Sequence, residues 1–389
     1  MKILLKPEFS KRVFIAGFAL FSMFFGAGNL IFPILIGTQT LGSYGYSIVG
    51  LLLTGVFVPF IGLFSMILFN GNRKHFFEAL GPVPTFLVLF SLLLLMGPIG
   101  AAPRCVIVSF SSFKMLFPDL SQPLFNAGYC ILVAALVWNR GRIVNIVGAV
   151  LTPLLFGSIL ILFFLGLFNG ALPINTHFTN MASFMKGLTE GYQTMDLLAA
   201  FFFSSTTVHY MYANLPEHCT RRTIAKLSLS AGIIGASMLA FVYVGFVLLG
   251  AKHSEMLQNL SPDKFLFAIA AKDIGRFAVP LVCTMFSLAC LTTVVALVSL
   301  FADFLNDDLS HKKLGEKSAT IITLIITYTV SLVDFTTICT WLGSVISVIY
   351  PALIAFAVAN IINKVSKIQK LPAVAFYLTL VSALFFRFL

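Results

Sequence analysis

The chain has 389 residues, of which 59% are hydrophobic and 10% are charged. Soluble domains are on average about half apolar and about a quarter charged, so this composition excludes an ordinary water-soluble fold. The formal net charge of +11 would suit a nucleic-acid partner if the basic residues formed one patch, but they are spread over alternate joints between apolar stretches. We therefore expect no nucleic-acid partner.

Long apolar stretches repeat from one end of the chain to the other. A lipid core of about 30 Å needs about 20 apolar residues for each helical crossing. Runs such as 51–69 do not alternate in polarity, which excludes a membrane β-barrel, and every span is predicted to be a helix. The sequence predicts about eleven spans, at 13–36, 44–69, 84–114, 123–139, 143–169, 188–212, 225–250, 274–304, 318–334, 337–363 and 372–388.

Basic residues gather at every second joint between these spans. The positive-inside rule places such joints in the cytoplasm, so we expect a cytoplasmic amino terminus. The outer joint 251–273 contains an amphipathic piece, 263–272, that we expect to lie on or cap the outer surface. No low-complexity linker divides the chain, so 1–389 is predicted to be one transmembrane domain. The basic clusters lie at 2–12, 73–74, 140–142, 221–226, 312–317 and 364–370.

The first span is interrupted near its middle by Gly26, Gly28 and Asn29, and Pro33 follows. Each glycine costs a continuous helix about 1 kcal/mol relative to alanine. Small residues also allow helices to pack closely, and this interpretation stays open. The alternative is a discontinuous helix whose freed backbone groups line a polar cavity.

The sixth span favours the discontinuous helix. It opens with the polar sequence 189–196 and only then becomes apolar, at 197–203. Five spans separate the two interruptions. When a repeat has an odd number of crossings, its second copy enters the membrane from the opposite side and has an inverted topology. We therefore expect a five-plus-five inverted repeat, with the first repeat at about 13–169, the second at about 188–363 and an additional helix at about 372–388.

Five sequence blocks carry a family resemblance. They are Phe24-Phe25-Gly26-Ala27-Gly28-Asn29-Leu30-Ile31-Phe32-Pro33, Gly97-Pro98 with Ala102-Pro103-Arg104, Leu151-Thr152-Pro153, Glu190-Gly191-Tyr192-Gln193-Thr194-Met195-Asp196 with Leu198-Ala199, and Ala289-Cys290-Leu291-Thr292-Thr293. In this order they resemble the branched-chain amino acid carrier family. The resemblance implies a LeuT-like symporter of a bacterial inner membrane that imports leucine, isoleucine and valine with sodium. That family usually has about twelve crossings, and the one missing here would lie outside the ten-helix core.

A free amino acid offers a carboxylate, an ammonium group and a side chain. The amino end of a half-helix suits the carboxylate, and the carbonyls that end the other half suit the ammonium group. Apolar contacts for the side chain could come from Phe25, Phe201 or Phe202. The predicted binding frame is Gly26, Ala27, Gly28 and Asn29, with Gly191, Tyr192, Gln193 and Thr194 opposite.

Adjacent hydroxyls on the eighth span could bind sodium. In the LeuT-like plan that the resemblance implies, Thr292 and Thr293 would meet carbonyls of the broken first helix, at Ser22 and Phe25. The alternative is that the two threonines bond back to their own helix.

Ionisable residues inside a membrane are expensive, by roughly 2.5 to 3.5 kcal/mol at a helix centre on insertion scales. Asp196 could bind the substrate ammonium, orient Gln193, carry a proton or cap the second half-helix. We expect Arg104 to be a structural clamp and Glu190 to be a gate or a solvated end residue.

The sequence contains no Gly-rich phosphate loop, no histidine spacing typical of metal sites and no nucleophile elbow. Its six cysteines have no paired spacing, which indicates free thiols. We expect a non-enzyme without a cofactor or an obligate protein partner. The leading hypothesis is sodium-coupled symport of branched-chain amino acids. The alternatives are a proton-coupled carrier of the same fold that works through Asp196 or serves another neutral solute, a channel, and a membrane-embedded enzyme.

Overall fold

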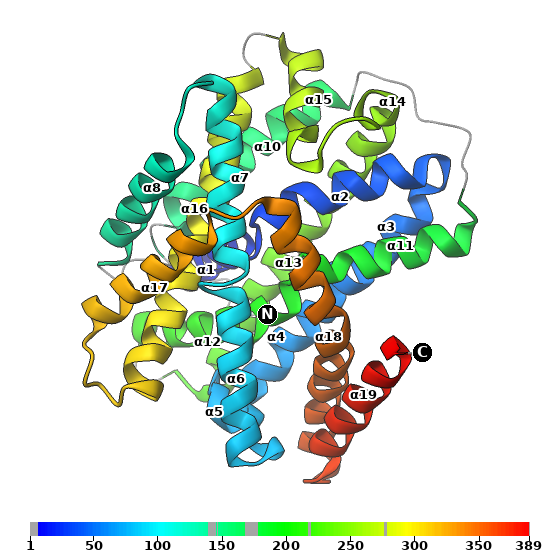
Figure 1. Cartoon of the computed structure of the whole chain (residues 1–389). Coiled ribbons are helices and arrows are strands. Elements are labelled where there is room, and N and C mark those ends of the chain that lie inside the picture. The colour runs from blue at the N-terminus through cyan, green and yellow to red at the C-terminus, as the bar shows by residue number, and fades with distance from the viewer. Residues whose placement is uncertain are drawn as a thin grey trace.

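A computed structural model describes residues 7–138, 145, 147–167, 178–216, 219–275 and 278–388. Within these ranges the chain forms helices joined by turns (Figure 1). The helices are α1 (Pro7–Phe24), α2 (Ala27–Thr40), α3 (Tyr44–Leu52), α4 (Val58–Leu68), α5 (Arg73–Phe77), α6 (Pro82–Met96), α7 (Ala101–Leu116), α8 (Gln122–Val137), α10 (Thr152–Gly166), α11 (Asn180–Gln193), α12 (Asp196–Asn214), α13 (Arg221–Lys252), α14 (Ser254–Leu257), α15 (Phe265–Ile274), α16 (Ala278–Phe304), α17 (Glu316–Val330), α18 (Phe335–Ser366) and α19 (Leu371–Phe388). Short π-helical or 3-10 turns extend several of them: η1 (Leu41–Ser43), η2 (Leu53–Phe57), η3 (Glu78–Leu80), η5 (Val147–Leu151), η6 (Pro262–Lys264) and η8 (Leu305–Leu309).

Several helical segments are long and apolar enough to cross a membrane. The longest has 42 residues and would extend for roughly 63 Å if it were straight, about twice the lipid core. It is not straight, because the chain turns at Leu41, whose φ is 46°. Each of the eleven predicted crossings contains at least one described helix, and three of them, 13–36, 84–114 and 188–212, are interrupted; the number of crossings stays a prediction. By length and composition, the described residues contain six such segments, Ala27–Leu68, Pro82–Leu116, Val147–Gly166, Arg221–Lys252, Pro280–Leu309 and Phe335–Ser366, and two shorter apolar helices, Gln122–Val137 and Leu371–Phe385.

The joints α4–α5, α16–α17 and α18–α19 lie at one end of the molecule, at the bottom of Figure 1. These are three of the joints with predicted basic clusters. The predicted surface helix at 263–272 exists as η6 and α15, and it lies at the opposite end (Figure 1). The described chain therefore has the two-ended pattern that the basic residues predict. The basic cluster at 140–142, the start of that at 2–12 and the start of the span at 143–169 lie outside the described residues.

Both predicted helix interruptions exist. The first separates α1 from α2 at Phe25 and Gly26, and Gly26 is extended. The second separates α11 from α12 at Thr194 and Met195, and Met195 has a left-handed φ of 62°. The discontinuous first and sixth helices that the sequence predicts are therefore present.

The unwound stretches are shorter than predicted, and this corrects part of the binding frame. Ala27, Gly28 and Asn29 form the first turn of α2 and do not lie in an open loop. The reason is local, because the Asn29 Oδ1 accepts a hydrogen bond from the Gly26 N–H at 3.2 Å and so supports the start of that helix. In the same way, the predicted residues 191–193 form the last turn of α11.

A further interruption was not predicted. The expected span at 84–114 is divided into α6 and α7 by a turn at Gly97-Pro98-Ile99-Gly100. A side chain at Gly100 would begin 1.8 Å from the Leu95 carbonyl oxygen, so only glycine fits this turn. The turn places the start of α7, including Arg104, beside the two predicted breaks.

Glycines hold the half-helices α2 and α11 against their neighbours. A side chain at Gly37 of α2 would begin 2.1 Å from the Val247 carbonyl oxygen of α13, and one at Gly187 of α11 would begin 2.0 Å from the Ser47 carbonyl oxygen of α3. Such close approach of backbones is typical of helix packing in membranes. Both half-helices are therefore packed closely on their neighbours, and they also pack on each other.

Candidate functional site

The two helix breaks border one small cavity of about 30 Å³. It holds little more than one water molecule, whose share of liquid volume is about 30 Å³. Both halves of the first broken helix contribute to its wall, as do the break between α11 and α12, the start of α7 and one face of α16. The lining residues are Met23, Phe24, Gly26, Ala27, Gly28, Asn29, Met96, Ala101, Arg104, Cys105, Thr194, Met195, Ala199, Phe203, Thr293 and Leu297.

A buried polar network joins the two breaks. The Asn29 Nδ2 donates to the Asp196 Oδ1 at 2.9 Å and to the Asp196 Oδ2 at 3.1 Å. The Tyr243 hydroxyl of α13 also donates to the Asp196 Oδ2. All three side chains are buried, so each needs these partners in place of water. The network therefore ties α12 to α2 and α13.

Asp196 is the first residue of α12, but capping is done by other groups. The Leu197 N–H donates to the Tyr350 hydroxyl of α18 at 3.0 Å. The Tyr350 ring packs at a tilt against Tyr192 of α11, with ring centroids 4.7 Å apart. Of the predicted roles for Asp196, the cap is the one this geometry does not favour, since the carboxylate accepts from Asn29 and Tyr243.

Tyr243 and Tyr350 were missed by the analysis of the sequence. Each is a tyrosine in a helix that also carries several serines and threonines, so the sequence held no signal that marks either hydroxyl. Their partners lie on helices far away along the chain, so the fold had to be known first.

The predicted sodium ligands of α1 and α16 come together in part. The Thr292 Oγ1 donates to the Ser22 carbonyl oxygen at 3.1 Å, and the Thr293 Oγ1 lies 3.3 Å from the carbonyl oxygens of Ser22 and Met23. Both hydroxyls also reach the Ala289 carbonyl oxygen of their own helix, at 2.9 and 3.1 Å. The two hydroxyls therefore bond back to their own helix and also bridge to α1, and sodium binding by them stays a prediction.

Phe25 does not join this cluster through any hydrogen bond among the described residues. Its N–H donates to the Phe21 carbonyl oxygen, and its ring stacks on Phe21 and Phe246 at centroid distances of 5.2 and 6.1 Å. Met23 and Ala289, which sequence reasoning missed, supply carbonyl oxygens at this position. Phe25 as a sodium ligand stays a prediction.

The apolar residues that line the small cavity differ from the three phenylalanines that the sequence suggested for an apolar pocket. Phe201 packs on Phe76 and Phe77 at 5.3 and 5.7 Å, and Phe202 lies under the Arg73 guanidinium at 5.9 Å. Neither lines the cavity. The chain has 42 phenylalanines, and the sequence alone could not indicate which of them line the cavity. The apolar walls come from Met23, Phe24, Met96, Phe203 and Leu297.

Of the four predicted frame residues in and after α11, Thr194 lines the cavity. Gly191 has a packing role, because a side chain there would begin 2.0 Å from the Thr54 Oγ1. The Gln193 carbonyl oxygen lies 3.4 Å from both terminal nitrogens of Arg104. Farther out, Glu190 forms an ion pair with Lys186 at 2.9 Å, which agrees with the expected end-of-helix role.

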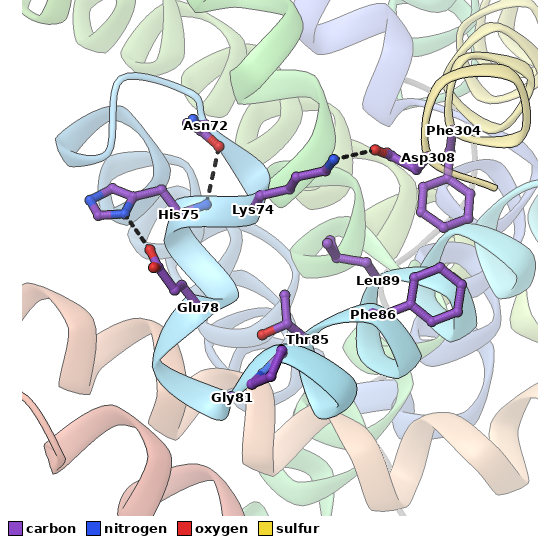
Figure 2. A pocket seen from close by; sticks show the side chains of 11 residues that line it. Asn72, Lys74, His75, Glu78, Gly81, Thr85, Phe86, Leu89, Phe304 and Asp308 are labelled. Carbon is purple, nitrogen blue, oxygen red and sulfur yellow. Dashed lines mark hydrogen bonds and ion pairs between the residues drawn. The ribbon is translucent and has the colours of Figure 1, made fainter. Parts of the chain in front are cut away.

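A larger cavity, of about 620 Å³, lies at the end of the molecule that carries α5 (Figure 2). The ion pair between Lys74 and Asp308 crosses it from α5 to η8. On another part of its wall, the His75 Nδ1 lies 2.7 Å from the Glu78 Oε2. Charged groups thus surround the larger cavity, whereas Arg104 is the ionised side chain that lines the smaller one.

The two cavities lie along the same pair of helices. Leu89 and Phe304 border the larger cavity, and Met96 and Leu297 border the smaller one. On both α6 and α16 these positions are seven residues apart, which corresponds to about 10 Å along a helix. The larger cavity therefore points along α6 and α16 toward the helix breaks.

Several apolar helices, two of them broken at a common interior cavity, define a polytopic membrane transport protein. The comparisons with known proteins identify the family. The profile of the family described as branched-chain amino acid transport protein matches residues 9–388, and the chain belongs to this family.

Relatives and solved structures agree with this assignment. A protein of Staphylococcus haemolyticus, provisionally named a branched-chain amino acid carrier, is 31% identical over 371 residues, covering 89% of this chain and 80% of its own. A protein of Staphylococcus epidermidis with the same provisional name is 29% identical over 368 residues, with the same coverage.

The solved structures establish the LeuT-like fold and nothing more, because their sequence identity is low. MhsT in complex with L-phenylalanine has a TM-score of 0.63 at 16% identity, covering 95% of this chain and 97% of its own. Mhp1, a nucleobase-cation-symport-1 family transporter in a closed conformation, has a TM-score of 0.62 at 13% identity, covering 96% and 90%. The chain is thus an all-helical, multi-pass membrane protein with a LeuT-like fold.

Proposed function

We propose that this protein is a symporter of a bacterial plasma membrane that imports leucine, isoleucine and valine together with sodium by alternating access. The observation that carries the proposal is the common cavity at the two helix breaks. Half-helix ends present free backbone donors and acceptors inside a membrane, where a zwitterion has no other partners. The family and the provisional names of its relatives support branched-chain amino acids as the cargo.

The cavity chemistry suits such a cargo. At the amino end of α2, the first backbone N–H groups have no partner within the helix and favour a carboxylate. The rest of the wall is apolar, as a branched aliphatic side chain requires. The volume of about 30 Å³ is too small for an amino acid, so the site must expand. Methionines suit this expansion, because their unbranched side chains adapt easily, and Met23, Met96 and Met195 all line the cavity.

Sodium binding is assigned to the cluster between α1 and α16. Sodium is a hard cation that takes neutral oxygen ligands, and this cluster offers two threonine hydroxyls with the carbonyl oxygens of Ser22 and Met23. In the proposal the hydroxyl protons turn away and the oxygens face the ion. The cluster bridges the first broken helix and α16, so an ion there would couple the two elements.

Proton coupling through Asp196 is a second candidate. It is favoured by one observation, a buried carboxylate that accepts a hydrogen bond from Tyr243 between the broken helices. A protonated Asp196 would no longer accept both bonds from Asn29, which would loosen the link between the breaks. This gives a physical route from a proton to a conformational change.

The proposed topology has eleven crossings, a five-plus-five inverted repeat and a cytoplasmic amino terminus. The basic joints at the α5 end of the molecule support this orientation. In this arrangement the larger cavity faces the cytoplasm, and the ion pair of Lys74 and Asp308 must rearrange when that side opens.

The test is uptake of labelled leucine, isoleucine and valine into proteoliposomes that contain the purified full-length chain. Sodium and pH gradients are imposed separately, with protein-free vesicles and D-leucine as controls. We expect saturable, stereoselective uptake that follows the inward sodium gradient. Accumulation driven by the pH gradient alone would favour the second candidate. Non-saturable flux at single-channel rates, or no flux of these amino acids, would contradict the proposal.

A further inference from the structure

Arg104 is a buried cation with no carboxylate partner among the described residues. Its side chain is 2% exposed, and the Nε has no hydrogen-bond partner in the described chain. The guanidinium also lies against the rings of Phe32 and Phe335, at 5.3 and 5.7 Å from their centroids. Removing a charge from water is costly unless an opposite charge and good hydrogen bonds replace the water. No carboxylate of the described residues therefore balances the charge of Arg104.

The existing partners of Arg104 do not supply that compensation. Both terminal nitrogens lie 3.4 Å from one acceptor, the Gln193 carbonyl oxygen, and the Nη1 lies 3.7 Å from the Met195 Sδ. Charge-assisted hydrogen bonds of arginine to carboxylates are shorter, about 2.7 to 2.9 Å, and are often bidentate. A structural clamp, which the sequence suggested, would be expected to hold its carbonyl more closely.

Arg104 points to the place where the proposed substrate would lie. It lines the small cavity, and a side chain at Gly28 would begin 2.8 Å from its Nη2. Gly28 belongs to the first turn of α2, whose dipole adds positive potential at the same point. The acid nearest in sequence to the second break, Asp196, accepts its hydrogen bonds from Asn29 and Tyr243. Two sources of positive potential thus converge on the cavity.

We propose that Arg104 is a substrate-binding residue that pairs with the α-carboxylate of the transported amino acid. This inference rests on the proposed function and deepens it. The two terminal nitrogens of the guanidinium donate to the carboxylate oxygens, and the amino end of α2 adds backbone donors. Glycine at position 28 keeps the space between them open. The site then selects amino acids by their free carboxylate and by an apolar side chain.

The consequence is discrimination against analogues that lack the negative charge. Leucinamide keeps the ammonium group and the side chain of leucine but cannot pair with a guanidinium. A hydrogen bond to a charged group contributes enough to change binding by about ten- to a hundredfold. We expect the wild-type protein to prefer leucine over leucinamide by at least that factor.

The experiment measures equilibrium binding of labelled leucine to the detergent-purified full-length protein at saturating sodium, with unlabelled leucine and leucinamide as competitors. The variants are Arg104→Gln and Arg104→Lys. The matched control is Arg73→Gln, because Arg73 also stacks on a phenylalanine but does not line the cavity. We expect Arg104→Gln to lose about ten- to a hundredfold in leucine affinity while leucinamide affinity changes by less than about threefold. The leucine affinity of Arg104→Lys should lie between those of the wild-type protein and Arg104→Gln, since lysine keeps the charge and loses the bidentate geometry.

Different failures of this experiment have different meanings. If the wild-type protein binds no leucine, the proposed function fails. If it binds leucine, but Arg104→Gln loses leucine and leucinamide affinity equally, Arg104 is a structural clamp and the inference is overturned. If Arg104→Gln does not fold, the wild-type comparison still decides, because equal competition by leucine and leucinamide would overturn the inference without any variant.

Discussion

Asn29 and Asp196 form a direct side-chain hydrogen-bonded link between the two broken helices, with the Asn29 Nδ2 at 2.9 and 3.1 Å from the two carboxylate oxygens. The same side chain also supports the start of α2 through the Gly26 N–H. One amide therefore sets the local shape of the first break and its distance from the second.

Substituting Asn29→Ala should lower both stability and transport. It leaves part of the Asp196 carboxylate without a partner in a buried site, which costs roughly 1 to 3 kcal/mol. It also removes one of the two acceptors of the Gly26 N–H, which keeps the Phe24 carbonyl oxygen at 2.9 Å. The measurement is thermal unfolding in detergent together with leucine uptake at equal protein density. The matched control is Asn214→Ala, which removes a hydrogen bond of Asn214 to Tyr210 within α12. Equal and small effects of the two variants would contradict the linking role.

Asp196→Asn distinguishes the two coupling hypotheses. The amide keeps the size of the side chain but cannot gain or lose a proton. Under sodium coupling, we expect Asp196→Asn to take up leucine at a reduced rate, and the dependence of this uptake on the sodium gradient should be unchanged. Under proton coupling, exchange of labelled for unlabelled leucine should continue while accumulation driven by a pH gradient disappears. Both assays use the same proteoliposomes.

The sequence predicted the broken helices because their signals are local. Glycine, proline and asparagine in an apolar run disfavour a continuous helix wherever they occur, so Gly26 and Met195 lie where interruptions were expected. The partners of Asp196 could not be predicted in the same way. Tyr243 lies 47 residues farther along the chain, and nothing in its neighbourhood in sequence marks it for this contact.

The surroundings of Arg104 could be predicted only in part, for a related reason. From sequence, a buried arginine is expected to find a carboxylate or a carbonyl, because most do. Which groups surround it depends on the turn at 97–100, which was not predicted, and on the packing of α7 against α16. Thr292 and Thr293 were singled out by a family resemblance and not by periodicity. The structure brings both hydroxyls to the Ser22 carbonyl oxygen, and sodium binding by them stays a prediction.

Thr293→Ala should weaken activation by sodium more than it weakens expression. The substitution removes one oxygen of the cluster with Ser22 and Met23, and we expect the sodium concentration for half-maximal uptake to rise by about tenfold, a change of about 1.4 kcal/mol. Thr327→Ala is the matched control, since the buried Thr327 hydroxyl bonds only back to Thr323 of its own helix among the described residues. An unchanged sodium dependence in Thr293→Ala would remove the sodium assignment.

Gly28→Ala should abolish leucine binding while leaving most of the fold intact. The added carbon would begin 2.8 Å from the Arg104 Nη2 and 3.2 Å from the Gln193 carbonyl oxygen. The guanidinium end can move aside, but it then leaves the position in which it would bind a carboxylate. Gly157→Ala is the control, because no heavy atom lies within 4 Å of the added carbon. Normal binding by Gly28→Ala would show that the cargo does not approach the first turn of α2.

The ion pair of Lys74 and Asp308 should influence how readily the larger cavity changes shape. Lys74 is 71% exposed and Asp308 is 20% exposed, so the pair contributes at most about 1 kcal/mol, and its loss should change transport by no more than about fivefold. We expect Lys74→Asp to have a larger effect than Lys74→Ala, because it adds repulsion with Asp308 across the cavity in addition to removing attraction. The double variant Lys74→Asp with Asp308→Lys restores opposite charges and should recover most of the activity. Uptake kinetics measured at low and high salt would test this, since screening weakens exposed pairs. If the double variant is no better than Lys74→Asp alone, the pair does not act across the cavity, and its contribution to the conformational cycle is excluded.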